Sequence, residues 1–239
     1  MKFLFLVFLF FGCGDHYKTI SETAVVNGVE TESYRAIVDL KLLRENGAIG
    51  LCTGTFIKKD LVLTAAHCVD GVLGVEVFGV RANKIIVDKN HEYTFNGMGH
   101  DFALLKFNKN ISKFVMKVST KPLKEGDLLT LVGYGINTYR PYSSGAWTKR
   151  VGFNVYKKNN YLNRGVVQFE GLQKPVNENG TYNFASVGQG DSGGPLIANG
   201  KIVGIASAQA LYNDVNSSYY AYTVSDKFYD FMFRAMQKI

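Results

Sequence analysis

Short apolar segments bounded by turn residues recur along most of this chain, and they constrain its fold more than any other feature. Each is four to seven residues long and is often flanked by Gly, Asn or Asp, a pattern typical of antiparallel sandwiches and barrels. Strands alternating with long helices are absent from the pattern, which argues against a doubly wound fold. We therefore predict an all-β protein, with strands at residues 36–42, 53–57, 61–64, 75–78, 84–87, 102–107, 128–132, 150–156, 166–169, 195–198, 202–206 and 220–224.

The spacing of apolar residues changes near the C-terminus. Phe228, Phe231, Met232 and Ala235 recur at helical spacing, and Ser225 stands where an N-cap is expected. The pattern predicts a C-terminal helix whose aromatic face packs on the β structure. A polar stretch at residues 119–127 is the predicted connection between two halves of the chain.

Residues 1–13 have the composition of an export signal. Lys2 is followed by nine apolar residues, whereas a helix that spans a bilayer needs about 20. Gly12-Cys13 resembles the end of a bacterial lipoprotein signal, in which the cysteine is lipidated and becomes the N-terminus, although Phe10 stands where leucine is usual. The alternative is ordinary cleavage nearby, which would leave Cys13 removed or as a free thiol.

The chain has three cysteines, an odd number. If Cys13 carries lipid, Cys52 and Cys68 remain and can pair, and an exported protein lies where such a bond persists. Closing a loop of this size would stabilise the fold by roughly 3 kcal/mol.

The formal net charge of the chain is +7. A basic exterior can favour acidic substrates or anionic surfaces. The lysines and arginines are scattered, however, with no run longer than two. We therefore expect a solvated basic surface and no nucleic-acid site.

Three segments carry candidate catalytic residues in the order His, Asp, Ser, which is the order of chymotrypsin-like enzymes. They are Leu63-Thr64-Ala65-Ala66-His67-Cys68, His100-Asp101-Phe102-Ala103-Leu104-Leu105-Lys106 and Gly190-Asp191-Ser192-Gly193-Gly194-Pro195. With these motifs, the sequence resembles the trypsin/chymotrypsin serine peptidases over nearly all of residues 25–239. Cys52 also stands where that family places the partner of Cys68.

The resemblance implies two packed six-stranded antiparallel β-barrels followed by the C-terminal helix. The expected N-terminal barrel, residues 25–121, carries His67 and Asp101, and the C-terminal barrel, residues 122–239, carries Ser192. Residues 14–24 then form a propeptide after the signal.

The three side chains have complementary chemistry. A serine hydroxyl needs a base, a histidine accepts its proton near neutral pH and returns it to the leaving group, and a buried carboxylate orients the imidazole. The resemblance therefore implies that Ser192 is the nucleophile, His67 the general base and acid, and Asp101 the orienting carboxylate. It also implies an oxyanion hole made by the N–H groups of Gly190 and Ser192.

Val25-Val26-Asn27-Gly28 resembles the mature N-terminus of this family, which proteolysis frees. The new ammonium group would pair with Asp191, the acid before the nucleophile. The simpler alternative is that Val25 only begins a strand. Ala24 precedes the expected cut, so we expect an activating protease that cuts after a small residue rather than a trypsin-like one. If Cys13 is lipidated, that cut would also release the enzyme from its membrane anchor.

The family pattern places Ser186 at the base of the substrate pocket, where no acid favours Lys or Arg. Ser207-Ala208-Gln209 forms the expected pocket wall, with Gln209 where glycine is usual, and Ser218 replaces a second glycine. Both changes would narrow the pocket. We expect small aliphatic side chains to be preferred, then aromatic, then basic.

The predicted function is that of an exported monomeric serine endopeptidase with a polypeptide substrate. We expect no cofactor and no metal site, since the acids between the His67 and Asp101 segments show no ligand-like cluster. The expected location is the periplasm or cell envelope, or outside the cell after activation. Two alternatives remain open at this point, namely a catalytically silent homologue that binds a partner and an esterase that uses the same groups.

Overall fold

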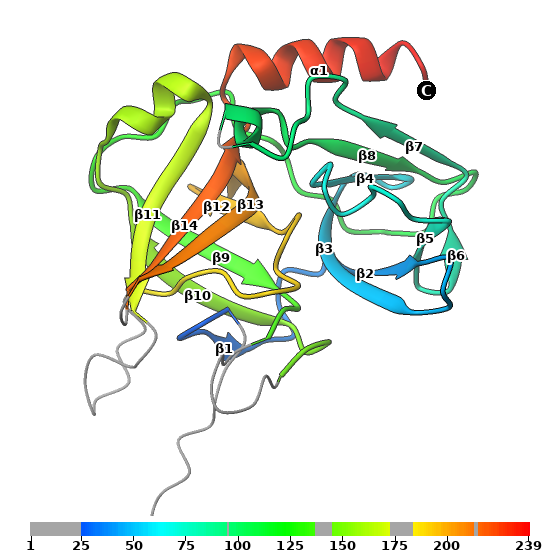
Figure 1. Cartoon of the computed structure of the whole chain (residues 1–239), viewed down its shortest axis with the longest axis horizontal. Coiled ribbons are helices and arrows are strands. Elements are labelled where there is room, and N and C mark those ends of the chain that lie inside the picture. The colour runs from blue at the N-terminus through cyan, green and yellow to red at the C-terminus, as the bar shows by residue number, and fades with distance from the viewer. Residues whose placement is uncertain (1–24, 95, 137–144, 173–183, 213–214) are drawn as a thin grey trace, which may run out of the picture.

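Two curled antiparallel β-sheets pack side by side, and one helix lies across one end of both (Figure 1). This computed structural model describes residues 25–94, 96–136, 145–172, 184–212 and 215–239. The predicted all-β, two-barrel class is confirmed. Each sheet contains seven strands rather than the six expected. The predicted signal, residues 1–13, and propeptide, residues 14–24, lie outside the described residues.

The first sheet is built from consecutive strands between Ile37 and Lys106. Its order is β6-β5-β2-β3-β4-β8-β7, and every neighbouring pair is antiparallel. The strands are β2 (Ile37–Leu43), β3 (Ile49–Lys58), β4 (Leu61–Thr64), β5 (Gly74–Val77), β6 (Val80–Arg81), β7 (Lys84–Val87) and β8 (Ala103–Lys106).

The second sheet joins one short N-terminal strand to the strands after residue 127. Its order is β1-β10-β9-β12-β13-β14-β11, again antiparallel throughout. The strands are β1 (Val29–Glu30), β9 (Leu128–Gly133), β10 (Arg150–Val155), β11 (Val166–Leu172), β12 (Pro195–Ala198), β13 (Lys201–Tyr212) and β14 (Val215–Tyr222). Two short 3-10 helices, η1 (Asn96–His100) and η2 (Asn160–Arg164), lie in the connections.

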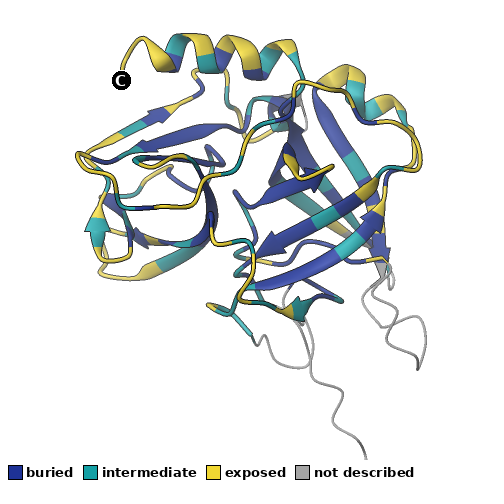
Figure 2. Cartoon of the chain, turned by 180° about the vertical axis from the view of Figure 1, so that it is seen from behind, coloured by how far each residue is buried: buried dark blue, intermediate teal, exposed yellow. Residues whose placement is uncertain are grey.

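The predicted C-terminal helix is present as α1 (Asp226–Met236). The Ser225 side chain caps it by accepting the N–H of Phe228 at 3.3 Å, as the sequence pattern predicted. Phe228 and Phe231 are buried and pack on Phe102, the residue after Asp101, with ring centroids 5.0 and 5.8 Å apart. Buried and exposed positions alternate along the helix in Figure 2, so only one face packs on the sheets.

A small apolar cluster lies between the two sheets. Ile37 from β2 packs with Val132, Val151 and Ile197 from the second sheet, and all four are buried. This cluster fixes the relative position of the two sheets, because interior packing is dense and tolerates little sliding. No helix among the described ranges is long and apolar enough to cross a bilayer.

Candidate active site

The pairing of β4 with β8 brings His67 next to Asp101. Thr64 at the end of β4 lies opposite Ala103 at the start of β8, so the residues just beyond these ends share one edge of the sheet. His67 Nδ1 lies 2.6 Å from Asp101 Oδ2, and the His67 backbone N–H donates to Oδ1 at 2.9 Å. The carboxylate therefore holds both the ring and the backbone of the histidine.

Asp101 stays ionised although it is buried. Burial alone would raise its pKa, but hydrogen bonds from His67 and Ser207 outweigh it and hold the pKa of Asp101 below its usual value. The Ser207 hydroxyl donates to Oδ2 at 2.6 Å. Because the carboxylate only accepts, it favours the tautomer of His67 that carries a proton on Nδ1 and leaves Nε2 free to take one.

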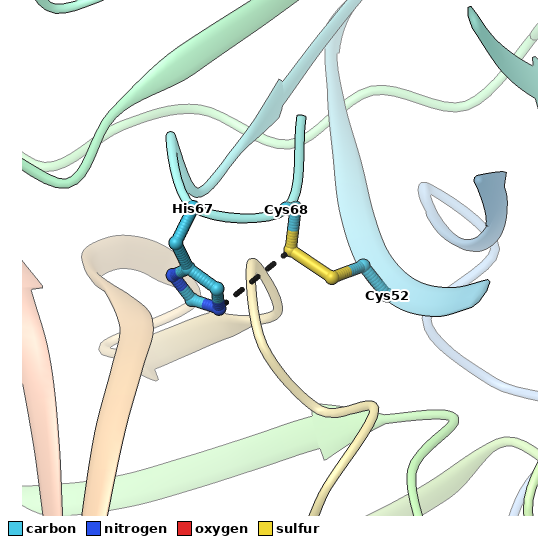
Figure 3. A group of neighbouring side chains, drawn as sticks. All are labelled: Cys52, His67 and Cys68. Atoms are coloured by element: carbon cyan, nitrogen blue, oxygen red, sulfur yellow. Dashed lines mark hydrogen bonds between the residues drawn. A yellow bond between two sulfur atoms is a disulfide. The ribbon is translucent and has the colours of Figure 1, made fainter. Parts of the chain in front are cut away.

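The predicted Cys52–Cys68 disulfide is confirmed, with the two Cα atoms 6.2 Å apart. Figure 3 shows the bond beside the His67 ring, where Nε2 lies 3.9 Å from Cys68 Sγ. These three side chains form the one group among the described residues whose His, Cys, Asp or Glu atoms are close enough to share a metal. Both thiols are consumed by the disulfide, so neither is available as a thiolate ligand.

Ser192 lies in a tight loop that only glycine permits at two positions. Gly190 has φ +95° and Gly193 has φ +79°, and both values lie in the region that L side chains avoid. A Cβ on Gly193 would also lie 2.1 Å from Thr64 Oγ1 and 3.0 Å from the Ala65 backbone nitrogen. The close approach packs the Ser192 loop against the segment that leads into His67.

The backbone N–H groups around Ser192 divide into two kinds. Those of Asp191, Gly193 and Gly194 donate to backbone carbonyls at 2.8 to 3.1 Å. Those of Gly190 and Ser192 donate to no group in the described part of the chain. Two unused donors beside a hydroxyl can stabilise negative charge that develops on a carbonyl oxygen.

The Ser192 hydroxyl forms no hydrogen bond with His67 Nε2 in the described structure. Such contacts are often long without substrate and tighten in the complex. The two loops are nevertheless joined through β3. The Thr53 N–H donates to the Ser192 carbonyl at 2.8 Å, and the neighbouring Cys52 is bonded to Cys68, the neighbour of His67.

Thr53 is a structural residue that the sequence reasoning missed. Its hydroxyl donates to the Gly190 carbonyl at 2.9 Å and accepts the Tyr134 N–H at 3.1 Å. Thr53 thus connects the first sheet to two loops of the second. A threonine within a predicted strand carries no local signal of such a role, because its partners lie 81 and 137 residues away.

Asp191 is fully buried beneath the Ser192 loop. Its carboxylate accepts the N–H groups of Gly188 at 2.7 Å and Gly135 at 2.8 Å, and also that of Val25. Burial raises the pKa of Asp191 to about 7, opposed by these hydrogen bonds and by Arg150. Within the described residues, the predicted activation pair is therefore in contact through the Val25 backbone N–H.

Val25 has an unfavourable backbone conformation. Its φ is +47°, which is rare for a β-branched residue, and it is 1% exposed. The next residue, Val26, forms a bridge with Ser186, whose N–H donates to the Val26 carbonyl at 3.1 Å. The start of the described chain is thus fixed against the base of the predicted substrate pocket.

The predicted pocket residues fall into two groups. Ser207 binds Asp101 through its hydroxyl, whereas Ser186, Gln209 and Ser218 lie around Val187. Ser186 and Ser218 are both 0% exposed. The Ser218 hydroxyl accepts the Val187 N–H at 3.1 Å, while Ser186 Oγ has no partner among the described residues.

Asn216 is a second polar residue that the sequence reasoning missed here. It is buried, and its side-chain amide donates to the Val187 carbonyl at 2.9 Å and to Gln209 Oε1 at 3.4 Å. Alternation along β14 could have suggested it, because Asn216, Ser218 and Tyr220 all face inward. Asn216 ties Gln209 to the loop that follows Ser186.

Comparison with known proteins gives one consistent family. The sequence model described as Trypsin matches residues 25–232. The chain is 28% identical to a trypsin of Sarcophaga bullata, in a match that covers 77% of this chain and 78% of the relative. It is 30% identical to chymotrypsin-2 of Vespa crabro, in a match that covers 65% of this chain and 76% of the relative. It is also 29% identical to a trypsin-like protease of Streptomyces glaucescens over 61% of this chain, a match that spans only 58% of that relative.

Proposed function

Because the chain belongs to the trypsin family of serine peptidases, we propose that it is an endopeptidase that hydrolyses peptide bonds through an acyl-enzyme on Ser192. The observation that carries the proposal is the 2.6 Å hydrogen bond between His67 and Asp101, and the N–H groups of Gly190 and Ser192, unused among the described residues, support it. In this proposal, His67 is the base, Asp101 orients it and the two N–H groups are the oxyanion donors for the Ser192 hydroxyl.

The proposed reaction has two halves. In the first, Ser192 Oγ attacks the scissile carbonyl carbon while His67 Nε2 takes its proton, and the Gly190 and Ser192 N–H groups bind the resulting oxyanion. His67 then gives the proton to the leaving amine as the C–N bond breaks. In the second half, water attacks the acyl-enzyme, His67 takes the proton of that water, and Ser192 is regenerated with release of the carboxylate product.

Turnover of an extended polypeptide tests this function. We expect the wild type to cleave it and Ser192→Ala to lose at least about 10⁴-fold in kcat/KM, since the nucleophile is removed. Ser33→Ala, which changes an exposed serine, is the matched control and should retain full activity. Hydrolysis of small esters without any peptide cleavage would instead indicate the esterase alternative. Absence of both activities after processing at Val25 would indicate a silent binding homologue.

We also propose that the chain is made as an inactive precursor and is cut before Val25. The strained φ of Val25 would cease to exist on cleavage, because the peptide bond that defines it is broken. The new ammonium group would supply buried Asp191 with a charged partner, which would favour the ionised carboxylate. Both effects favour the cut state. N-terminal sequencing of the active form should give Val25, and any other start would contradict the proposal.

This cut implies an order of export, membrane anchoring and release. Export would precede activation, lipid on Cys13 would hold the precursor at a membrane, and a protease that cuts after Ala24 would release the enzyme. Cys13 lies outside the described residues. Mass spectrometry of the precursor not yet cut at Val25 should find a chain that begins at a lipidated Cys13, whereas an unmodified or absent Cys13 would contradict the anchoring step.

The pocket supports a preference for small, uncharged side chains. Its predicted base contains no acid, and Gln209 is held across the wall by Asn216. We expect Gln209→Gly to raise kcat/KM for aromatic peptides relative to small aliphatic ones, because the substitution removes side-chain volume from the wall. An unchanged ratio would show that Gln209 does not limit the pocket.

A further inference from the structure

One oxygen of the Asp101 carboxylate has spare capacity for a hydrogen bond. Oδ2 accepts from both His67 Nδ1 and Ser207 Oγ at 2.6 Å, whereas the one hydrogen bond that Oδ1 accepts from the described residues comes from the His67 backbone N–H at 2.9 Å. Each oxygen of an ionised carboxylate offers about two acceptor sites. Nδ1 of His91 lies 3.6 Å from Oδ1, the oxygen that the ring of His67 does not contact.

His91 is a partly buried histidine whose ring nitrogens are shielded from solvent. Its side chain is 12% exposed, and neither ring nitrogen forms a hydrogen bond among the described residues. A buried N–H group without an acceptor is costly, so the ring gains from any acceptor within reach. A movement of about 0.7 Å would bring Nδ1 to ordinary hydrogen-bond distance from Asp101.

Tyr93 and the backbone of Asp88 both contact His91. The Tyr93 ring packs edge-on against it, with centroids 5.1 Å apart, and the Tyr93 hydroxyl donates to Asp70 at 2.8 Å. Burial and Asp70 raise the pKa of Tyr93 to about 12, so the hydroxyl keeps its proton at neutral pH. The His91 backbone N–H is also fixed, to the Asp88 carbonyl at 3.1 Å.

A pocket links His91 to the substrate. His91, His67 and Met98 line the same cavity of about 290 Å³, together with Tyr93 and Ala208. A substrate side chain that fills this cavity would displace water from the His91 ring. Exclusion of water strengthens the attraction between its N–H and the Asp101 carboxylate.

We propose that His91 is a positioning residue for the catalytic base, donating from Nδ1 to Asp101 Oδ1 when substrate occupies the adjacent pocket. The carboxylate is then held by donors on both oxygens and keeps its orientation toward His67 as the imidazolium forms. The proposal rests on the function proposed above for His67 and Asp101. His91 does not touch the reacting atoms.

The titratable groups that face His91 can be named for the described residues. They are Asp101 and His67 across the pocket, Glu92 beside it, and Tyr93 with Asp70 behind, while Arg44 acts electrostatically on Tyr93. A donor on Oδ1 draws negative charge away from the oxygen that faces His67. Its removal should therefore stabilise protonated His67 in the substrate complex and move the acidic limb of the kcat profile, which reports that complex, to higher pH.

Two substitutions distinguish the effect of the His91 hydrogen bond from the effect of the His91 ring. His91→Phe keeps an aromatic ring against Tyr93 but has no N–H, whereas His91→Asn keeps an N–H at the position of Nδ1. For His91→Phe we expect kcat to fall about fivefold with little change in KM, and the acidic limb to rise by roughly half a pH unit. His91→Asn should keep most of the wild-type kcat and nearly the wild-type acidic limb. Equal loss in the two variants, or a wild-type profile in His91→Phe, would overturn the proposal.

A nitrogen-15 NMR spectrum of Ser192→Ala, saturated with a peptide that it does not cleave, tests the same bond without turnover. The proposal requires that His91 carry a proton on Nδ1, and the Nε2–H tautomer would overturn it. If no peptide or ester is hydrolysed, the proposed function fails, yet this tautomer still decides the role of His91. The two failures are therefore distinguishable.

Discussion

Asp191 is the residue whose charge should depend most on whether the chain has been cut. Its pKa in the uncut fold is about 7, against 3.8 for an ordinary aspartate. Between these values the folded chain binds a proton that the unfolded chain has lost. The free energy of unfolding should therefore fall as pH rises from about 4 to about 7, by on the order of 4 kcal/mol for a fully buried group.

Cleavage before Val25 should weaken this dependence, because an ammonium partner favours the ionised carboxylate. Denaturant unfolding of the full chain and of protein that starts at Val25, each at pH 5 and pH 8, measures the difference. We expect cleavage to stabilise the fold more at pH 8 than at pH 5. Parallel profiles for the two forms would contradict the pairing of Val25 with Asp191.

The hydroxyl of Ser207 binds Asp101, so we expect Ser207 to act on that carboxylate rather than on the substrate. Ser207→Ala removes one of the two 2.6 Å hydrogen bonds to Oδ2, so the pKa of Asp101 should rise and its orientation loosen. We expect kcat/KM to fall about tenfold, the usual scale for a hydrogen bond to a charged group. Steady-state kinetics beside the Ser33→Ala control would measure it, and an unchanged kcat/KM would argue against this role.

Single residues also mark the limit of prediction from sequence. His67, Asp101 and Ser192 are recognisable because each lies in a local motif, and the structure brings His67 and Asp101 into contact. Thr53 and His91 carry no such motif. Their roles depend on distances between segments that are remote in sequence, which no local pattern encodes.

The C-terminal helix should stabilise the segment that carries Asp101. Phe231 is 2% exposed and stacks on Phe102, whereas Phe233 on the same helix is 69% exposed. We expect Phe231→Ala to lower the free energy of unfolding by about 3–5 kcal/mol and Phe233→Ala to change it by less than about 0.5 kcal/mol. Denaturant titration of both variants checks this. Similar losses in the two would show that α1 does not pack through the Phe231 face.

The disulfide should stabilise the loop that positions His67. Its cysteines are 16 residues apart in the sequence. Replacing both by alanine should cost about 3 kcal/mol, from the greater freedom of the unfolded chain. Calorimetry of the double variant against the wild type measures this loss, and equal melting temperatures would contradict it.

At the level of elements, the turn-bounded apolar pattern predicted most strands well. The bounds of β4, β7 and β12 match the predicted segments, and the N-cap of α1 is the predicted serine. β1 and β6 were missed because two residues are too few to show a period. β13 and β14 run beyond their predicted segments, since small and polar residues there pair with each other without an apolar signal.

The whole molecule explains why the candidate site needs both sheets. The first sheet supplies His67 and Asp101, and the loop before β12 of the second sheet supplies Ser192, with Thr53 joining the two sides. The order of the motifs predicted this division. The sequence could not predict how the halves are joined, because the partners of Thr53 are remote from it in the sequence.

Covalent labelling with a serine-reactive phosphonate, mapped by peptide mass spectrometry, tests most directly whether Ser192 is the activated nucleophile. We predict that the label attaches to the peptide that contains Ser192 in protein starting at Val25. Labelling should be lost in Ser192→Ala and strongly slowed in His67→Ala. A label on another serine, or equal labelling of wild type and Ser192→Ala, would contradict the proposed mechanism.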